Sequence, residues 1–114
     1  MSEKHIPPNP RTKKWSRVVR DTGAPDHNSY YHQDIVAQIE KYEMACFSAQ
    51  QLLLEDYPTR YYWGKFKRIV GASEGQETPF MLVEHNASTG EVHGHPVTRQ
   101  ELHEKGVPYE ALDS

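Results

Sequence analysis

Cysteine is almost absent from this chain of 114 residues, because Cys46 is the only one. A single cysteine cannot form a disulfide within the chain, and it cannot supply the two or more thiolates of a cysteine-based structural zinc site. No apolar run approaches the ~20 residues of a transmembrane helix. The first residues also lack the apolar segment of a secretory signal. We therefore expect a cytoplasmic protein with no membrane contact.

Motifs of the common enzyme classes are missing as well. The chain contains no G-x-G-x-x-G or Walker A loop for phosphates, and no G-x-S-x-G turn for a nucleophilic serine. Cys46 falls on the apolar stripe of a predicted helix, where cysteine usually behaves as a small buried hydrophobe. The sequence thus favours a protein that is not an enzyme. It assigns no catalytic residue and no organic cofactor.

The chain is long enough for one small domain. Hydrophobic residues make up 36% and aromatic residues 11% of it, so the core is expected to be small and rich in aromatic rings. A domain of this size buries little surface by itself, and association between copies of the chain is therefore compatible with its size.

Charge and proline divide the chain. Residues 1–20 carry six basic residues and one acidic residue, a charge of +5, whereas residues 21–114 carry 7 basic and 15 acidic residues, a charge of −8. Prolines crowd the first ten residues. We expect a flexible, basic, proline-rich arm over residues 1–13, a single domain over residues 14–106 and a C-terminal tail over residues 107–114. The arm is either solvated, folded back on the acidic body, or used to contact a nucleic acid or an acidic partner.

The pattern of apolar residues predicts an α+β fold. Apolar residues recur at three- and four-residue steps over residues 29–55, which contain neither glycine nor proline, and this predicts one long amphipathic helix. Alternating patterns predict strands over residues 59–70, 78–85 and 91–97, with a further strand over residues 14–20 and a polar loop over residues 71–77. We expect the helix to pack on an antiparallel sheet of three to four strands.

A short helix is expected near the C-terminus. Thr98 and Glu101 have the spacing of a capping box, and Gly106 can end the helix after Lys105. The residues after Gly106 are expected to be loosely attached.

The stretch around residues 84–96 could place two histidines and a carboxylate on one face of a hairpin. If residues 87–90 form the loop, Glu84 lies opposite His93 and His95 follows on the same face. Two histidines and a carboxylate are a ligand set for zinc or a similar metal. The alternative is an ordinary cross-strand Glu–His pair, because no fixed motif spacing accompanies these residues. A metal at Glu84, His93 and His95 is therefore the one cofactor that the sequence suggests.

Aromatic and basic residues alternate between Arg60 and Arg68, and this is the most suggestive stretch for binding. Aromatic residues and arginine anchor protein interfaces, and aromatic–basic strands also stack bases and neutralise phosphates. The predicted function is a small binding protein, an adaptor, inhibitor or regulator, that contacts another protein. The alternatives are a nucleic-acid-binding module that uses the same surface and a small metal-dependent enzyme. The binding residues expected from the strand and the arm are Arg11, Lys13, Lys14, Trp15, Arg17, Tyr61, Trp63, Lys65 and Lys67.

Overall fold

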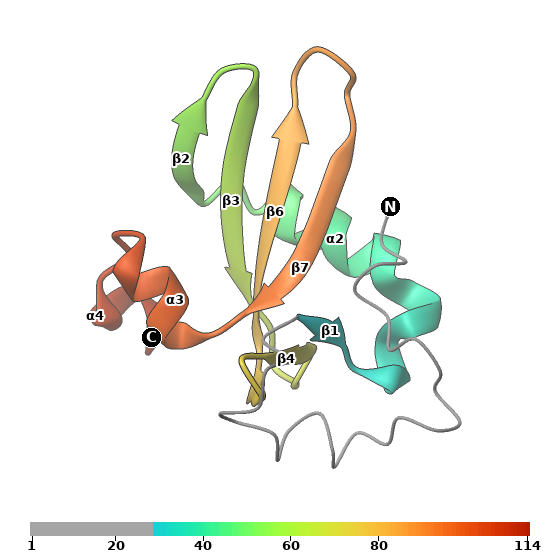
Figure 1. Cartoon of the computed structure of the whole chain (residues 1–114), viewed down its shortest axis with the longest axis vertical. Helices are drawn as coiled ribbons and strands as arrows, with labels where there is room; N and C mark the ends of the chain where they lie inside the picture. The colour runs from blue at the N-terminus through green and yellow to red at the C-terminus, as the bar shows by residue number, and fades with distance from the viewer. Residues whose placement is uncertain (1–28) are drawn as a thin grey trace.

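The computed structural model describes residues 29–114, and these residues form an α+β fold with two antiparallel sheets (Figure 1). The larger sheet has the order β2-β3-β6-β7, and its strands are β2 (Leu52–Asp56), β3 (Thr59–Lys65), β6 (Phe80–Asn86) and β7 (Val92–Val97). The smaller sheet has the order β1-β4-β5, and its strands are β1 (Tyr30–Tyr31), β4 (Gly71–Ser73) and β5 (Gln76–Thr78). The fold class is confirmed, but the expected single sheet is wrong.

Some expectations fall on residues that the structure does not describe. The basic arm over residues 1–13 and the strand over residues 14–20 lie outside the described residues. The same holds for five of the expected binding residues, which are Arg11, Lys13, Lys14, Trp15 and Arg17.

The long helix expected over residues 29–55 is shorter and less regular. It consists of a 3₁₀ segment, η2 (Gln33–Gln38), followed by α2 (Ile39–Ser48). At the start of the span that was expected to be helical, Tyr30–Tyr31 instead form β1, which pairs with β4. At its end, residues from Leu52 onward form β2, which pairs with β3. Gln50 has a positive φ of 55°, which ends the helical path. Leucine favours helices, but pairing with a neighbouring strand overrides this preference at Leu52–Asp56.

The polar loop expected over residues 71–77 is instead the hairpin that joins β4 to β5. Glu74 and Gly75 both have positive φ, 52° and 73°. A two-residue hairpin turn needs positive φ at both positions to match the right-handed twist of the strands that it joins. The following strand, β6, forms a second hairpin with β7, in which Asn86 pairs its backbone N–H with the carbonyl of Glu91. The side-chain oxygen of Asn86 also accepts from the N–H groups of Ser88 and Thr89, at 2.8 and 3.2 Å, which fixes this turn.

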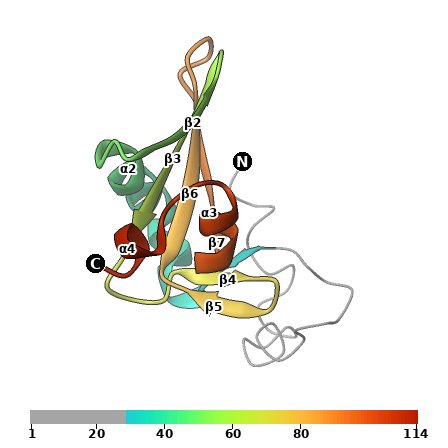
Figure 2. The ribbon, with the colours of Figure 1, turned by 90° about the vertical axis from the view of Figure 1, so that its left-hand side faces the viewer.

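The larger sheet is covered on both faces. On one face, η2 and α2 pack against β3 and β6 around a cluster of buried residues that includes Ile35, Cys46 and Met81. On the other face, α3 (Arg99–Glu104) and α4 (Tyr109–Leu112) cover Trp63 with Leu102 and Leu112. Figure 2 shows this sheet nearly edge-on, with α2 on its left-hand side.

The C-terminal segment differs from the expected tail. The capping box at Thr98 is confirmed: its hydroxyl accepts from the N–H of Glu101, and the Glu101 carboxylate accepts from the N–H of Thr98. After α3 the chain turns back, and residues 107–114 include α4. The side chains of Val107 and Leu112 are buried in the same cluster as Leu102 of α3. These residues are thus part of the packed domain.

A buried carboxylate ties three segments together. Glu43 on α2 is only 4% exposed, and its Oε2 accepts from the hydroxyl of Tyr31 and from the backbone N–H of Gly94, each at 2.9 Å. A Cβ on Gly94 would lie 2.8 Å from a methyl of Val83 and 3.1 Å from the Tyr31 hydroxyl, so only glycine lets β7 approach this closely. The contacts join β1, α2 and β7, and therefore the small sheet to the large one.

Replacing Tyr31 by phenylalanine should destabilise the fold. A hydrogen bond to a charged group contributes about 1.5–3 kcal/mol, and its loss leaves the buried carboxylate with one donor fewer. We expect urea unfolding, followed by circular dichroism, to show a loss of free energy in this range. Tyr57→Phe is the matched control, because Tyr57 is 82% exposed and should unfold like the wild-type chain. Equal stability of the two variants would show that this contact does not hold the sheets together.

Candidate binding surface

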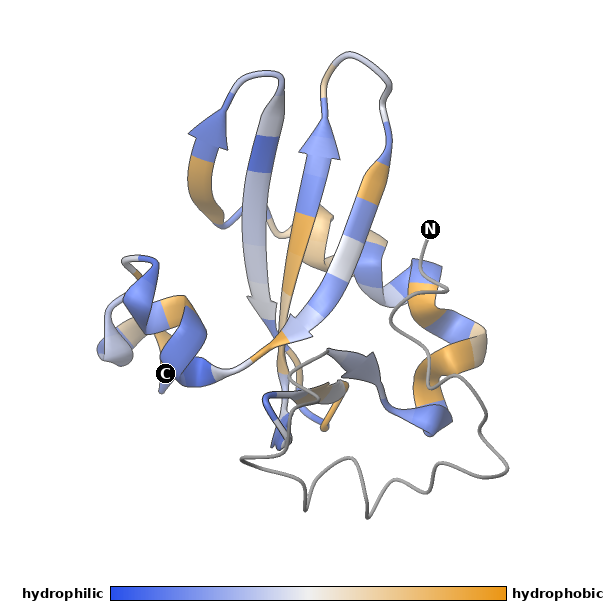
Figure 3. Ribbon diagram, viewed as in Figure 1, coloured by the Kyte–Doolittle hydropathy of each residue, from blue (hydrophilic) through white to orange (hydrophobic). Residues whose placement is uncertain are grey.

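The outer edge of β2 is open and apolar. β2 is the first strand of the larger sheet, and within residues 29–114 no strand pairs with its outer side. Leu52 is 54% exposed, Leu54 is 56% exposed and Tyr57, just after the strand, is 82% exposed. We refer to these three residues as the leucine edge; the apolar half of β2 is visible in orange in Figure 3. Natural proteins usually shield such an edge, so its exposure marks a place where another chain can pair.

A groove runs beside this edge on the face of the sheet that carries α3. Its volume is about 330 Å³, and it is lined by Leu53, Leu54, Tyr61, Leu82 and Lys105. Four of these five side chains are apolar or aromatic, and the lysine stands at the end of α3. The groove can therefore accept an apolar side chain of a strand that lies along β2.

β3 borders both this groove and a second hollow. Its residues Tyr61, Trp63 and Lys65 alternate onto the same face of the sheet, as the sequence predicts. Trp63 is only 8% exposed and packs in the core, with its ring 6.4 Å from that of Phe80. Of the expected strand residues, Tyr61 is half-buried in the groove and Trp63 is mainly a core residue. Lys65 and Lys67 are exposed, Lys67 lying just after the strand.

The second hollow, which we call the C-terminal hollow, has a volume of about 440 Å³. Its lining consists of Gln51, Trp63, Lys65, Phe66, Lys67, Ala111 and Ser114. The Nζ of Lys65 lies 3.5 Å from the backbone oxygen of Ser114 and 5.8 Å from the ring centre of Phe80. Two of the seven residues, Trp63 and Lys65, come from β3 itself, and Phe66 and Lys67 follow the strand. Ala111 of α4 lies in the opposite wall.

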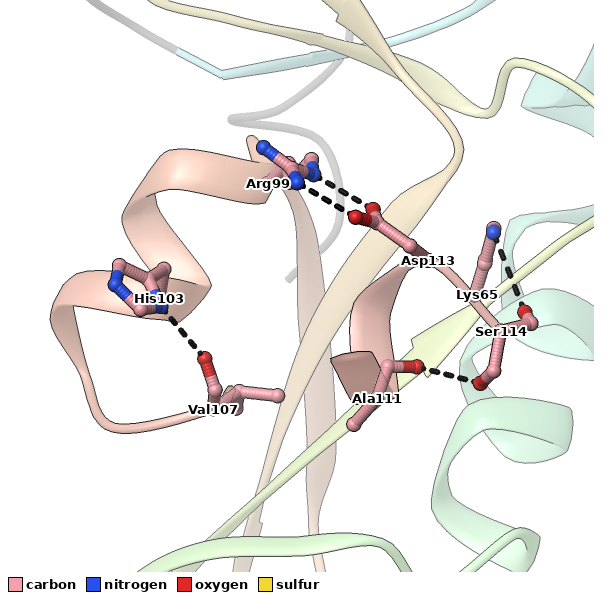
Figure 4. Close-up of polar contacts among 7 residues, drawn as sticks. All are labelled: Lys65, Arg99, His103, Val107, Ala111, Asp113 and Ser114. Atoms are coloured by element: carbon pink, nitrogen blue, oxygen red, sulfur yellow. Dashed lines mark hydrogen bonds and ion pairs between the residues drawn. The ribbon is translucent and has the colours of Figure 1, made fainter. Parts of the chain in front are cut away.

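That wall is held by a set of polar contacts between α3 and α4 (Figure 4). The guanidinium of Arg99 donates to both carboxylate oxygens of Asp113, at 2.7 and 2.6 Å, and lies 4.0 Å over the ring of Tyr109. The hydrogen bond from Arg99 holds the pKa of the Asp113 carboxyl below its usual range. His103 stacks on the same Tyr109 ring, with 3.6 Å between the two ring centres. These contacts position Ala111 and Ser114 beside β3.

The histidine hairpin has the register that the sequence predicts. Glu84 lies opposite His93, and Leu82 lies opposite His95, on one face of β6 and β7. The Nε2 of His93 lies 2.8 Å from a carboxylate oxygen of Glu91, its neighbour two residues earlier. Within residues 29–114, no group of three or more histidine, cysteine or acidic side chains is arranged to hold a metal ion. The metal site at Glu84, His93 and His95 thus gains no support from the geometry.

A third hollow lies between α2 and this hairpin. It has a volume of about 390 Å³ and is lined by Glu40, Glu43, Met44, Phe47, His85, Gly90, Val92 and His93. The ring of His85 packs on that of Phe47 at 4.9 Å, which makes part of the floor aromatic. The buried Glu43 carboxylate at its wall already accepts two hydrogen bonds from the protein. In this hollow the carboxylate therefore has a structural role.

The leucine edge was missed by sequence reasoning. The three leucines at positions 52–54 continue the apolar stripe of the preceding helix, so they fit a helical pattern as well as a strand. The available signal was the pair Tyr57-Pro58, which marks a turn between two apolar runs and hence a hairpin.

The comparisons with known proteins do not assign a function. Family models, curated proteins and solved structures were compared with the chain, and none of them matches it. Across residues 29–114, no helix combines the length and the apolar character that a membrane span needs.

The thiol of Cys46 should be inert in the folded protein. It is 1% exposed, and burial, together with the nearby charge of Glu43, raises its pKa to about 12. The thiolate is the reactive form, so at pH 8 a thiol reagent should modify the native chain far more slowly than the chain in concentrated urea. The single cysteine makes this a direct measurement by absorbance. Equal rates in the two conditions would contradict the packing of Cys46 against the sheet.

Proposed function

We propose that this chain is a small non-enzymatic binding protein that acts as an adaptor, inhibitor or regulator through contacts with another protein. The observation that carries the proposal is the leucine edge: two leucines and a tyrosine, each more than half exposed, on or just after the open outer strand of the sheet. Exposed apolar residues of this size on an edge strand are a typical feature of a surface that a partner covers.

The geometry suggests how a partner would dock. An extended segment of the partner would pair its backbone with the outer edge of β2 and so extend the sheet by one strand. Because side chains alternate along a strand, every second residue of that segment would face the groove beside Leu54 and Tyr61. Backbone pairing would supply affinity, and the groove would supply specificity for apolar side chains.

Nucleic-acid binding, the main alternative, has less support at this edge. β2 ends in Glu55 and Asp56, whose negative charges oppose a phosphate backbone. Residues 29–114 carry 13 acidic and 7 basic side chains, so a long polyanion would meet repulsion over most of the surface. Among the residues that the structure describes, the basic side chains that a nucleic acid could use lie instead around Lys65 and Lys67.

The leucine edge can be tested with one substitution. Leu54→Lys places a charge on the edge, which disfavours pairing of another strand there, and it should cost the fold little because the site is more than half exposed. Proteins captured by the wild-type chain from cells that express it would be identified by quantitative mass spectrometry. We expect the recovery of a direct partner to fall at least ~10-fold with Leu54→Lys, the equivalent of about 1.4 kcal/mol of binding free energy.

Gln76→Lys is the matched control, because it introduces the same charge at an exposed position of β5 in the smaller sheet. It should leave the recovery of the partner unchanged. Titration calorimetry with the purified partner and both variants would then separate direct from indirect binding. If the purified partner binds Leu54→Lys as tightly as the wild-type chain, the leucine edge is not the binding surface.

A further inference from the structure

Phe66 is the common wall of two hollows that lie side by side. One is the C-terminal hollow, with Lys65 and Lys67 at its rim. The other has a volume of about 250 Å³ and is lined by Gln38, Lys41, Tyr42, Ala45 and Phe66, so it opens along α2. We propose that the two hollows together form a docking site for an acidic protein segment that places an apolar side chain against Phe66 and carboxylates beside the lysines.

The aromatic wall is held in place by its surroundings. Phe66 is half-buried against the core, and its backbone N–H donates to the carbonyl of Pro79 at 2.9 Å. Its ring lies 5.1 Å from that of Tyr42 at an angle of 59°. A preformed apolar wall of this kind lets a ligand side chain bind without first ordering the protein, which lowers the entropic cost of binding.

The lysines around this wall are not neutralised in the way that the arginines are. Arg60, Arg68 and Arg99 form ion pairs with Glu55, Asp34 and Asp113. Within residues 29–114, Lys41 and Lys67 form no ion pair. Lys65 lies close enough to Asp113 to lower the pKa of that carboxyl, but its own Nζ contacts a backbone oxygen and an aromatic ring. The patch is therefore positive on an otherwise acidic body.

An acidic peptide fits this patch better than a nucleic acid does. Three lysines border these hollows, which is fewer than the roughly 6–10 phosphate contacts of a protein whose affinity for DNA depends strongly on salt. The ring of Phe66 is half-buried and already packed against the ring of Tyr42, so less of it is left for a stacked base than on an exposed ring.

This inference rests on the proposed function, because it names the chemistry of a segment that a protein partner would present. It concerns a different part of the surface, however. The leucine edge accepts an apolar strand, and the patch around Phe66 accepts acidic residues. Charged groups on the patch would mainly accelerate and orient the encounter.

The test uses a short fluorescein-labelled peptide that has two glutamates on each side of a central phenylalanine. Fluorescence anisotropy with the full chain should show binding that weakens as salt is added, because exposed charges are screened over about 10 Å at 0.1 M salt. Lys41→Glu and Lys67→Glu should together weaken binding at least ~10-fold, since each turns an attraction into a repulsion. Lys105→Glu, the same change at a lysine outside both hollows, should leave the affinity close to that of the wild-type chain.

Three results would overturn the inference. The first is binding that does not change in the Lys41→Glu, Lys67→Glu double variant. The second is equal binding of a peptide whose phenylalanine is replaced by glycine, which would show a purely ionic attraction without the aromatic wall. The third is tighter binding of an oligothymidylate of equal charge at the same lysines, which would favour nucleic acid.

Failure of this test and failure of the proposed function can be told apart. If the peptide does not bind but a purified partner still depends on Leu54, the protein-binding function stands and the acidic segment is wrong. If the peptide binds through the lysines but no partner depends on Leu54, the leucine edge is wrong and the patch around Phe66 is the binding site.

Discussion

The carboxylate of Glu43 is the contact on which the arrangement of the two sheets depends. It is buried beneath α2 and accepts from a tyrosine of β1 and from the backbone of β7, so a single acidic group links the small sheet, the helix and the edge of the large sheet. A buried charge is costly unless hydrogen bonds compensate it, and here both donors come from fixed positions. Gly94 is required for the same reason, because a larger residue would separate β7 from the carboxylate.

The contacts of Glu43 join the small sheet to the β7 side of the large sheet, so the two edges of the large sheet are covered unequally. The helical face of the large sheet is closed by η2 and α2, and the lower part of its other face is closed by α3 and α4. The β7 side lies against the small sheet, where the hydroxyl of Thr78 donates to the carbonyl of Val97 at 2.7 Å. The β2 side has no such cover within the described residues, and it is the side that carries exposed leucines. The proposed binding function follows from this asymmetry between the two edges of the sheet.

Local turn and capping chemistry could be predicted from the sequence, and tertiary pairing could not. The register of β6 and β7 follows from a four-residue loop after Asn86, and the start of α3 follows from Thr98 and Glu101, because these signals act over a few residues. The leucines at 52–54 satisfy a helical and an extended pattern equally, and only the presence of β3 decides between them. The same dependence on a distant strand hid the hairpin of β4 and β5, since β4 pairs with β1 about 40 residues earlier. The candidate surface was therefore predicted only in part: Tyr61, Lys65 and Lys67 border open hollows, Trp63 belongs mainly to the core, and the leucine edge was missed.

Backbone amide hydrogen exchange of the chain with and without its purified protein partner tests the central claim most directly. Strand addition would place new hydrogen bonds on the open side of β2, so amides within Leu52–Asp56 should exchange more slowly in the complex. Amides of β5, in the smaller sheet, should be unaffected and serve as the internal reference. Unchanged exchange in β2 together with new protection elsewhere would contradict the account, because the partner would then bind without using the edge that the fold leaves open.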